Sequence, residues 1–402
     1  MELVTADRVV TGRPGEVLEE AGVLFEGNRI EWVGRLAELT ADRRAGASRA
    51  HYAGATILPG LIDSHVHLGF DGGPDPVQRM KGETDAEQLV LMLFSARELL
   101  GAGVTSARDL GARSFLDVTV KRAIADGLAE GPRLLTAARP ITVTGGHCWF
   151  MGGEADGLDA IRHQVRLHHK RGADLIKVMA TGGHMTKGSV PWHAQFDEGE
   201  MRALVSEAHR LEKKVAAHAH GTEGIRNAAA ARVDTIEHCS WAAGSDASEY
   251  DPATADRIAE AGIHVCPTFN WRAQRMPGRW EGRAQRLDAM HEAGVRIVAG
   301  TDSGINLTPH RQYVGGLEAL EAAGMPALEV LEAATSRAAT ALGLEAVTGR
   351  LAPGVEVDLL VADGNPMTDL GALRHLHLIL TRGRRAIPHP ELAAEPTAEP
   401  VP

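Results

Sequence analysis

The chain has 402 residues, of which 44% are hydrophobic, so it can bury a large core and is too long for one small domain. Its 42 basic and 53 acidic side chains give a formal charge of −11, which argues against a surface that binds nucleic acid or an anionic membrane. We therefore expect a small-molecule partner, no nucleic acid and no membrane.

Both ends of the chain have the sequence pattern of short strands separated by turns. Near the start, LVTADRVV is followed by GVLFEGNRIEWVG, in which the Gly27-Asn28 pair suits a tight hairpin. Near the end, VDLLVAD and LHLILTRG are again strand-like. We predict one small β-sandwich domain built from residues 1–54 and 345–390.

The middle of the chain, residues 55–344, alternates short apolar runs with alanine-rich helical stretches. Repeated β–α units of this kind indicate an α/β fold with a parallel sheet, and about eight of them indicate a (β/α)8 TIM-type barrel. The proline- and alanine-rich residues 391–402 predict a disordered tail.

The stretch LPGLIDSHVHLG, residues 58–69, closes an apolar run with two histidines one residue apart. Alternate residues of a strand share a face, so His65 and His67 are expected to point the same way. With Asp63 nearby to orient a ring, the pair makes half of a metal site.

Further polar residues close the later apolar runs of the predicted barrel. In such a barrel the C-terminal ends of the strands meet at one face, where function resides. Four imidazoles, a carboxylate and a lysine would gather there, a donor set that suits zinc. After the first pair, these residues are Lys177 in DLIKVMATGG, His218 in KVAAHAHG, His238 in DTIEHCS and Asp302 in RIVAGTDSG.

The set resembles the amidohydrolase superfamily, which is carried by PGLIDSHVH, the lysine of the fourth strand, HAH, EH and GTDSG. Within that superfamily, GVTSARDLG, TGGHC and Lys177 are similar to the prolidase-like branch of Xaa-Pro dipeptidases and Xaa-Arg(Lys) carboxypeptidases. Imidazolonepropionase is similar at a greater distance, because its fourth strand is not expected to supply a lysine ligand.

The resemblance implies two Zn²⁺ ions per chain. His65 and His67 would bind the first ion, His218 and His238 the second, and Lys177 would bridge them. An ammonium has no lone pair to donate, so the resemblance implies that Lys177 is carboxylated. Asp302 would bind the first ion and act as general base and then general acid. The implied reaction is hydrolysis of a C–N amide bond, with dipeptides or N-acyl amino acids that carry a free carboxylate as the leading substrates.

Two of these residues have a plainer interpretation. Lys177 would instead form a buried ion pair with Asp302 or Glu237, which would leave a site for one metal ion. Asp302 would instead cap the helix that follows GTDSG.

Two more histidines are candidates for substrate contacts. His147 lies in a glycine-rich segment and would polarise the substrate carbonyl, whereas the alternative is a loop histidine bound to backbone. His220 shares a face with His218. The dipeptidase-like relatives tend to have tyrosine at this position, so His220 departs from their pattern.

Residues 267–286, PTFNWRAQRMPGRWEGRAQR, concentrate arginine and tryptophan in an acidic protein. Arginines at the catalytic face would attract a carboxylate, and the tryptophans would wall an apolar group. Trp271 and Arg272 are the substrate-binding candidates, and a solvated helix face or a subunit contact is the alternative. Residues 184–192 predict another loop over the site, whereas His168 and His169 are expected on the surface of a helix.

The sequence gives little support for an enzyme that uses a serine or cysteine nucleophile. The sequence has no G-x-S-x-G elbow, and Cys148 beside His147 is a nucleophile only if the metal ligands are ignored. The three cysteines match no disulfide framework, which favours a reducing, cytoplasmic setting. We predict a homo-oligomeric hydrolase. The alternatives are hydrolysis of another amide, carbamate, urea or cyclic amide, and a non-catalytic metal- or ligand-binding barrel.

Overall fold

The computed structural model describes residues 1–245, 247–275 and 278–389, so the predicted tail at 391–402 lies outside the described residues. The two ends of the chain share one seven-stranded sheet, ordered β15-β14-β13-β4-β1-β2-β3. Its strands are β1 (Glu2–Val10), β2 (Val17–Glu26), β3 (Arg29–Arg35), β4 (Ser48–Pro59), β13 (Leu359–Ala362), β14 (Leu376–Thr381) and β15 (Arg384–Ala386).

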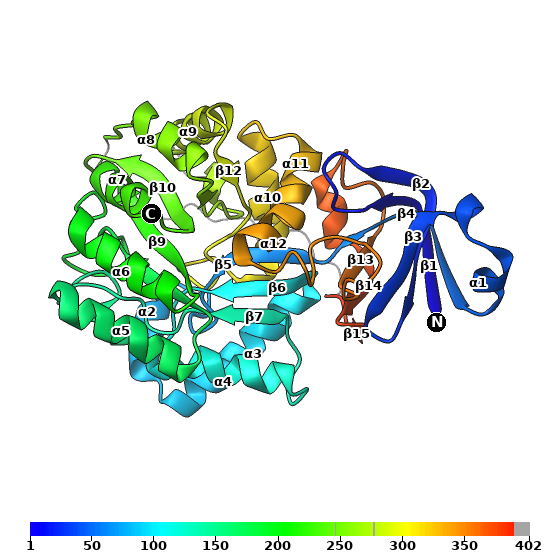
Figure 1. The fold of residues 1–402 in the computed structure, drawn as a ribbon, viewed down its shortest axis with the longest axis horizontal. Coiled ribbons are helices and arrows are strands. Elements are labelled where there is room, and N and C mark those ends of the chain that lie inside the picture. The colour runs from blue at the N-terminus through cyan, green and yellow to red at the C-terminus, as the bar shows by residue number, and fades with distance from the viewer. Residues whose placement is uncertain (246, 276–277, 390–402) are drawn as a thin grey trace.

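This sheet joins residues that are far apart in the sequence. Figure 1 shows the blue strands of the chain start beside the orange-red strands of the chain end. Strand β4 pairs with β1 in parallel and with β13 in antiparallel orientation. The β2–β3 hairpin turns at Gly27, whose φ of 59° is a conformation that favours glycine. A cluster of buried side chains that includes Val23, Ile57 and Val361 gives the sheet a core of its own.

The described middle of the chain forms parallel strands in two sheets, ordered β12-β11-β10-β9-β8 and β5-β6-β7. Isolated parallel bridges, Val66 to Ser303 and Ile141 to Val178, link these sheets. The α/β class is confirmed, while closure of the predicted barrel stays a prediction. The strands are β5 (Leu61–Val66), β6 (Val104–Asp109), β7 (Arg133–Thr136), β8 (Leu175–Met179), β9 (Lys214–Gly221), β10 (Thr235–Ala242), β11 (His264–Cys266) and β12 (Arg296–Ile297).

Helices alternate with these strands and cover them from outside (Figure 1). Two helices begin with a capping box, at Thr84 with Glu87 and at Asp197 with Glu200, which satisfies amide groups at the helix start. The α-helices are α1 (Ala41–Ala45), α2 (Pro76–Gly82), α3 (Asp85–Gly101), α4 (Leu116–Ala125), α5 (Gly157–Arg171), α6 (Glu198–Arg210), α7 (Thr222–Ala231), α8 (Pro252–Glu260), α9 (Trp280–Glu292), α10 (Tyr313–Ala322), α11 (Ala327–Ala333) and α12 (Ser336–Leu342). Short 3₁₀ helices are η1 (Leu36–Glu38), η2 (Arg113–Phe115), η3 (Trp149–Met151), η4 (Ala273–Arg275), η5 (His310–Gln312) and η6 (Leu370–Arg374).

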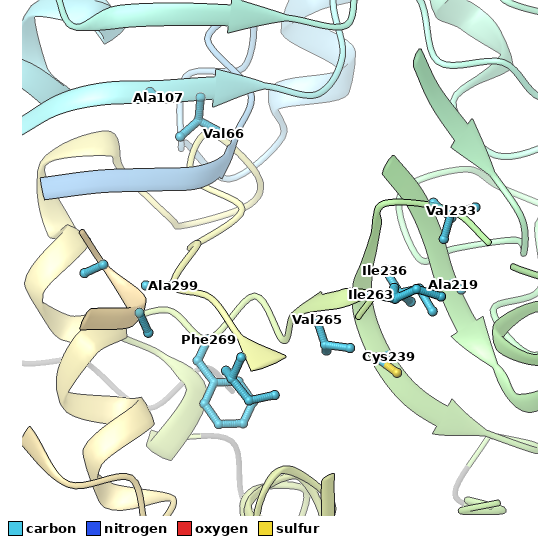
Figure 2. Packing of buried hydrophobic residues seen from close by; sticks show 14 of the residues in the cluster. Val66, Ala107, Ala219, Val233, Ile236, Cys239, Ile263, Val265, Phe269 and Ala299 are labelled. Atoms are coloured by element: carbon cyan, nitrogen blue, oxygen red, sulfur yellow. The ribbon is translucent and has the colours of Figure 1, made fainter. Parts of the chain in front are cut away.

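The core between the parallel strands and the helices is continuous. Figure 2 shows part of it, with Ala219 on β9, Ile236 and Cys239 on β10 and Val265 on β11. These apolar side chains fix the strands, so the polar residues at and beyond the strand ends are held at one rim.

The prediction that His168 lies on the surface is wrong. His168 is fully buried, and its two ring nitrogens bond the carbonyl oxygens of Gln164 and Arg139. Its spacing from Ile161 and Val165 places it on the apolar face of α5, a pattern that the polar neighbours obscured in the sequence. His169, on the next position, is exposed as predicted.

Candidate metal centre

His65, His67 and Asp302 form what we call the first donor group, in which one ligand atom from each residue lies within 4.8 Å of the others. Nε2 of His65 and Nε2 of His67 lie 3.3 and 3.2 Å from Oδ1 of Asp302. The two histidines therefore face the same way, as the alternation in LPGLIDSHVHLG predicts. Asp302 reaches them because its amide donates to the carbonyl of His65 and its φ of 58° turns the chain there.

Asp63 does not orient an imidazole, so that prediction is wrong. Its carboxylate accepts the amides of His65 and Thr301, each at 3.1 Å, and the hydroxyl of Thr301 at 2.6 Å. Burial raises the pKa of Asp63 to about 7. Asp63 thus ties the end of β5 to the segment that carries Asp302, through two backbone amides and the Thr301 hydroxyl.

Glu237 orients His65 instead. Its Oε2 lies 2.9 Å from His65 Nδ1, and its Oε1 accepts from Arg108 Nη2 at 2.7 Å and from the hydroxyl of Thr235. Burial alone would raise the pKa of Glu237, but Arg108 and His65 hold it well below its ordinary value. An anionic Glu237 fixes the proton of His65 on Nδ1 and leaves Nε2 free to bind a metal.

Arg108 completes this buried chain and was missed at the sequence level. It lies inside β6 and also donates to the carbonyl of Ser64 and the hydroxyl of Thr235. A charged residue at the core-facing position of GVTSARD was the available signal, because a buried arginine needs a buried carboxylate.

His218, His220 and His238 form the second donor group. One ring nitrogen from each residue lies within 4.8 Å of the others. His218 and His220 share a face of β9, with ring centroids 4.7 Å apart. The rings of His220 and His238 stack at 4.3 Å. His220, expected at the substrate, therefore also stands among the donors that can hold a metal.

Hydrogen bonds set the free nitrogen of two of the three rings in this group, His218 and His238. Nε2 of His218 lies 3.0 Å from the carbonyl of Gly182, which only accepts, so Nδ1 of His218 keeps the lone pair. Nδ1 of His238 lies 2.8 Å from the Thr268 hydroxyl, which donates its own proton to the Pro267 carbonyl. Nε2 of His238 is therefore the free donor.

His238 owes its direction to an irregularity in β10. The register with β9 shifts after His238, whose φ is 70°. A bulge of this kind re-aims a side chain next to a functional site. Strict alternation along DTIEHCS could not have predicted this direction.

Lys177 lies in the middle of β8 and is 1% exposed, and its Nζ has no hydrogen-bond partner among the residues that the structure describes. It forms no ion pair with Asp302 or Glu237, so the plainer interpretation of Lys177 does not describe the structure. Burial lowers its pKa to about 8. Its charge lowers the pKa of His67 in the first donor group and of His218 and His238 in the second.

These residues fit a metal. Imidazole nitrogens and a carboxylate are the ligands that zinc takes, and burial keeps the imidazoles neutral, which is the form that binds a metal. The two groups adjoin, since the ring centroids of His65 and His238 lie 5.3 Å apart. Ligand atoms of His65, Glu237 and Cys266 also lie within 4.8 Å of one another. There both oxygens of Glu237 are already bonded and burial raises the pKa of the thiol.

His147 lies beside the second donor group, with its ring centroid 4.7 Å from that of His218. Its Nδ1 is buried and has no hydrogen-bond partner in the described ranges, so the alternative of a ring bound to backbone does not describe this nitrogen. Burial lowers its pKa to about 3, which keeps the ring neutral. A Cβ on Gly183 would lie 2.4 Å from Nε2 of His147, so only glycine lets the ring approach. The neighbouring Cys148 thiol has its pKa raised to about 12 by burial and is a poor nucleophile.

In the arginine- and tryptophan-rich segment, Arg283 lies near the second donor group, whereas Trp271 and Arg272 were the expected substrate contacts. Trp271 Nε1 and Arg272 Nη1 donate to the carbonyls of Leu307 and Asn306, in the loop that follows Asp302. These polar atoms are engaged by backbone. Arg283, on α9, instead donates to the carbonyl of Pro267 and acts electrostatically on His220. In the predicted loop at 184–192, His184 packs edge-on against His220, with ring centroids 5.2 Å apart.

The model of the amidohydrolase family matches residues 56–387, a span that includes both donor groups. The chain belongs to the amidohydrolase family. It is 30% identical over 399 residues to an ochratoxinase of Aspergillus niger, covering 89% of this chain and 80% of that protein. An imidazolonepropionase of Cereibacter sphaeroides is 28% identical over 387 residues, covering 88% and 91% of the two chains.

A solved structure extends this similarity to the fold. The crystal structure of a Xaa-Pro dipeptidase with methionine bound in its active site superposes with a TM-score of 0.84 at 26% identity, covering 96% of this chain and 99% of that one. The predicted family is thereby confirmed, and the chain is a metal-dependent amidohydrolase. None of the helices in the described part of the chain has the length and apolarity needed to cross a membrane.

Proposed function

We propose that the enzyme hydrolyses a C–N amide bond with two zinc ions held by the two donor groups and bridged by carboxylated Lys177. One observation carries this proposal: a fully buried lysine without a hydrogen-bond partner acts electrostatically on both groups. Burial favours its neutral amine, the form that takes up carbon dioxide. His65, His67 and Asp302 would hold one ion, and His218 and His238 the other.

The bound metal supplies Lewis-acid polarisation of the scissile carbonyl and lowers the pKa of water. Asp302 accepts the proton of the attacking water and passes it to the departing nitrogen. Its Oδ1 faces the two imidazoles, whereas its Oδ2 accepts no hydrogen bond from a described residue. The imidazoles hold the pKa of Asp302 well below its ordinary value despite burial, so it starts as the base.

His147 would place a neutral imidazole near the carbonyl oxygen of the substrate. Because no described residue bonds its Nδ1, no hydrogen bond at that nitrogen fixes the tautomer of the ring. A hydrogen bond from this ring would stabilise negative charge on that oxygen. The second role proposed for His220, as a substrate contact, is supported by its half-buried position and by its neighbour His184.

The leading substrates are dipeptides or N-acyl amino acids with a free carboxylate, supported by the similarity to a Xaa-Pro dipeptidase. The alternative is another small-molecule amide, carbamate, urea or cyclic amide, supported by the similarity to an imidazolonepropionase. A screen of dipeptides, N-acyl amino acids and cyclic amides with zinc-loaded enzyme decides between them.

Asp302→Asn tests the mechanism. The amide keeps the size of the side chain but cannot accept a proton, so we expect a fall in kcat of at least about 100-fold. The control is metal content, which should stay near that of the wild type because His65 and His67 remain. Undiminished hydrolysis would contradict the role of Asp302, and a wild type that turns over no amide would favour the non-catalytic binding barrel.

Three predictions from the sequence stay predictions. They are the division into a small β domain of residues 1–54 and 345–390 and a barrel of residues 55–344, the homo-oligomeric state and the cytoplasmic location. Light scattering of the purified enzyme measures the oligomeric state directly.

A further inference from the structure

Arg283 is a half-buried cation beside the second donor group. It lies in the first turn of α9, and its guanidinium carbon packs 4.6 Å from the ring centroid of Phe269. Among the residues that the structure describes, no carboxylate lies within ion-pair distance of Arg283. Within the described part of the chain, its one hydrogen bond runs from Nη2 to the carbonyl of Pro267, at 3.1 Å. A guanidinium has five N–H donors, so most of its donor capacity is unused.

The hydrogen bond to Pro267 places Arg283 close to a predicted metal ligand. The same carbonyl accepts the Thr268 hydroxyl at 2.8 Å, and that hydroxyl bonds Nδ1 of His238. Arg283 also acts on His220 and His184, whose pKa values it lowers, while Asp302 acts on Arg283 in the opposite direction. Burial and two neighbouring arginines lower the pKa of Arg283 to about 10, so it is charged at neutral pH.

The other arginines of the segment are placed differently. Arg272 is engaged by the loop after Asp302, Arg286 donates to Ser248, and Arg279 is exposed. Arg275 packs over the ring of Trp271. Three hydrogen bonds, through the Pro267 carbonyl and the Thr268 hydroxyl, link Arg283 to Nδ1 of His238.

We propose that Arg283 binds the free α-carboxylate of the substrate next to the second donor group, a proposal that rests on the proposed C–N hydrolase function. A single carbon atom separates an α-carboxylate from the scissile nitrogen, so this carboxylate must lie beside the metal ligands and not at the outer rim. A planar guanidinium matches a carboxylate with two parallel hydrogen bonds. Arg283 thereby selects amides whose amine product is an α-amino acid.

The test compares N-acetyl-L-phenylalanine with N-acetyl-L-phenylalaninamide, which differ only in the carboxylate. Binding of each to metal-free protein is measured by calorimetry, and hydrolysis of each is measured with zinc-loaded enzyme. We expect the wild type to bind the carboxylate more tightly, and Arg283→Met to weaken that ligand roughly 10- to 100-fold while the amide is unaffected. Arg283→Lys keeps the positive charge but lacks the planar guanidinium that donates two parallel hydrogen bonds. Its affinity for the carboxylate ligand should therefore lie between those of Arg283→Met and the wild type.

Arg286→Met is the matched control, one turn further along α9, and should leave the ratio of the two affinities unchanged. A purely structural Arg283, which held Pro267 and through it His238, would weaken both ligands alike and lower the zinc content; that outcome overturns the proposal. So does equal binding of the two ligands by the wild type, which decides the matter even if the Arg283 variants fold poorly.

The two proposals fail in different ways. If the wild type hydrolyses no amide but binds the carboxylate through Arg283, the hydrolase function is wrong and the carboxylate site stands. If the wild type hydrolyses both ligands at equal rates and binds them equally, the hydrolase function stands and the carboxylate site is wrong.

Discussion

The two donor groups are built from the same kind of ring but are supported in different ways. In the first group, His65 is fixed by a buried ion pair between Glu237 and Arg108, and a carboxylate, Asp302, is one of the donors. In the second group, the rings are fixed by hydroxyl groups and a backbone carbonyl, and no carboxylate is among the donors. The first group therefore carries negative charge to offset a cation, whereas the second does not.

This difference predicts unequal metal affinity. A charged partner raises the basicity of a ligand and holds its tautomer more firmly than a hydroxyl does. We expect a chelator to remove the ion of the second group before the ion of the first. Four substitutions break or sharpen this comparison.

Glu237→Gln should have the largest effect. The amide cannot accept from Arg108 and His65 at once, so one buried donor loses its partner, at a cost of about 3–5 kcal/mol in the free energy of unfolding. Affinity for the first zinc ion should fall about 10- to 100-fold. Denaturant unfolding and zinc titration measure the two effects.

Glu207→Gln is the control for that variant, because Glu207 pairs with Arg166 and Arg210, whose side chains are exposed. Its cost should stay near or below about 1 kcal/mol with no change in zinc affinity. Equal effects of the two variants would show that the pair at His65 has no special role.

Lys177→Ala removes the proposed bridge between the groups. Zinc per chain, measured by mass spectrometry of the metal, should fall from near two toward one, and the remaining ion should belong to the first group. The control is Lys177→Met, which fills the volume but cannot be carboxylated. One ion per chain in the wild type and in both variants would contradict the bridged pair.

Thr268→Val removes the acceptor for Nδ1 of His238 while keeping the shape of the side chain. Affinity for the second zinc ion should fall about 10-fold, with the first unchanged. Thr348→Val is the matched control, because the Thr348 hydroxyl is buried without a partner. Loss of the first ion instead would invert the assignment of His238.

Ser240→Ala should have the smallest effect, since Ser240 bonds Nδ1 of His220, which no ligand assignment from the sequence includes. We expect a loss of affinity for the second ion well below about 10-fold. Ser95→Ala, which removes another buried hydroxyl without a partner, serves as control. A loss as large as that of Thr268→Val would make His220 a ligand and not only a substrate contact.

The sequence alone predicts much of the first group and of the fold. Alternation along a strand fixes the shared face of His65 and His67, and the recurrence of polar residues after apolar runs brings Lys177, His218 and Asp302 to one rim. These inferences need only local periodicity and the geometry of a parallel sheet, and both are properties of neighbouring residues.

Other features depend on the tertiary structure. Glu237 on β10 bonds directly to His65 on β5 and to Arg108 on β6. Arg283, and not Arg272, is linked to His238, although both arginines lie in the same segment. Tertiary packing also decides that Asp63 binds backbone and that His168 is buried.

The sequence by itself therefore determined which residue types gather at the rim, because strand periodicity is local. Only the tertiary structure decided which nitrogen of each ring is free and which cation stands beside the site. Those properties depend on hydrogen bonds between residues distant in the chain and on left-handed backbone at His238 and Asp302, which no local pattern encodes.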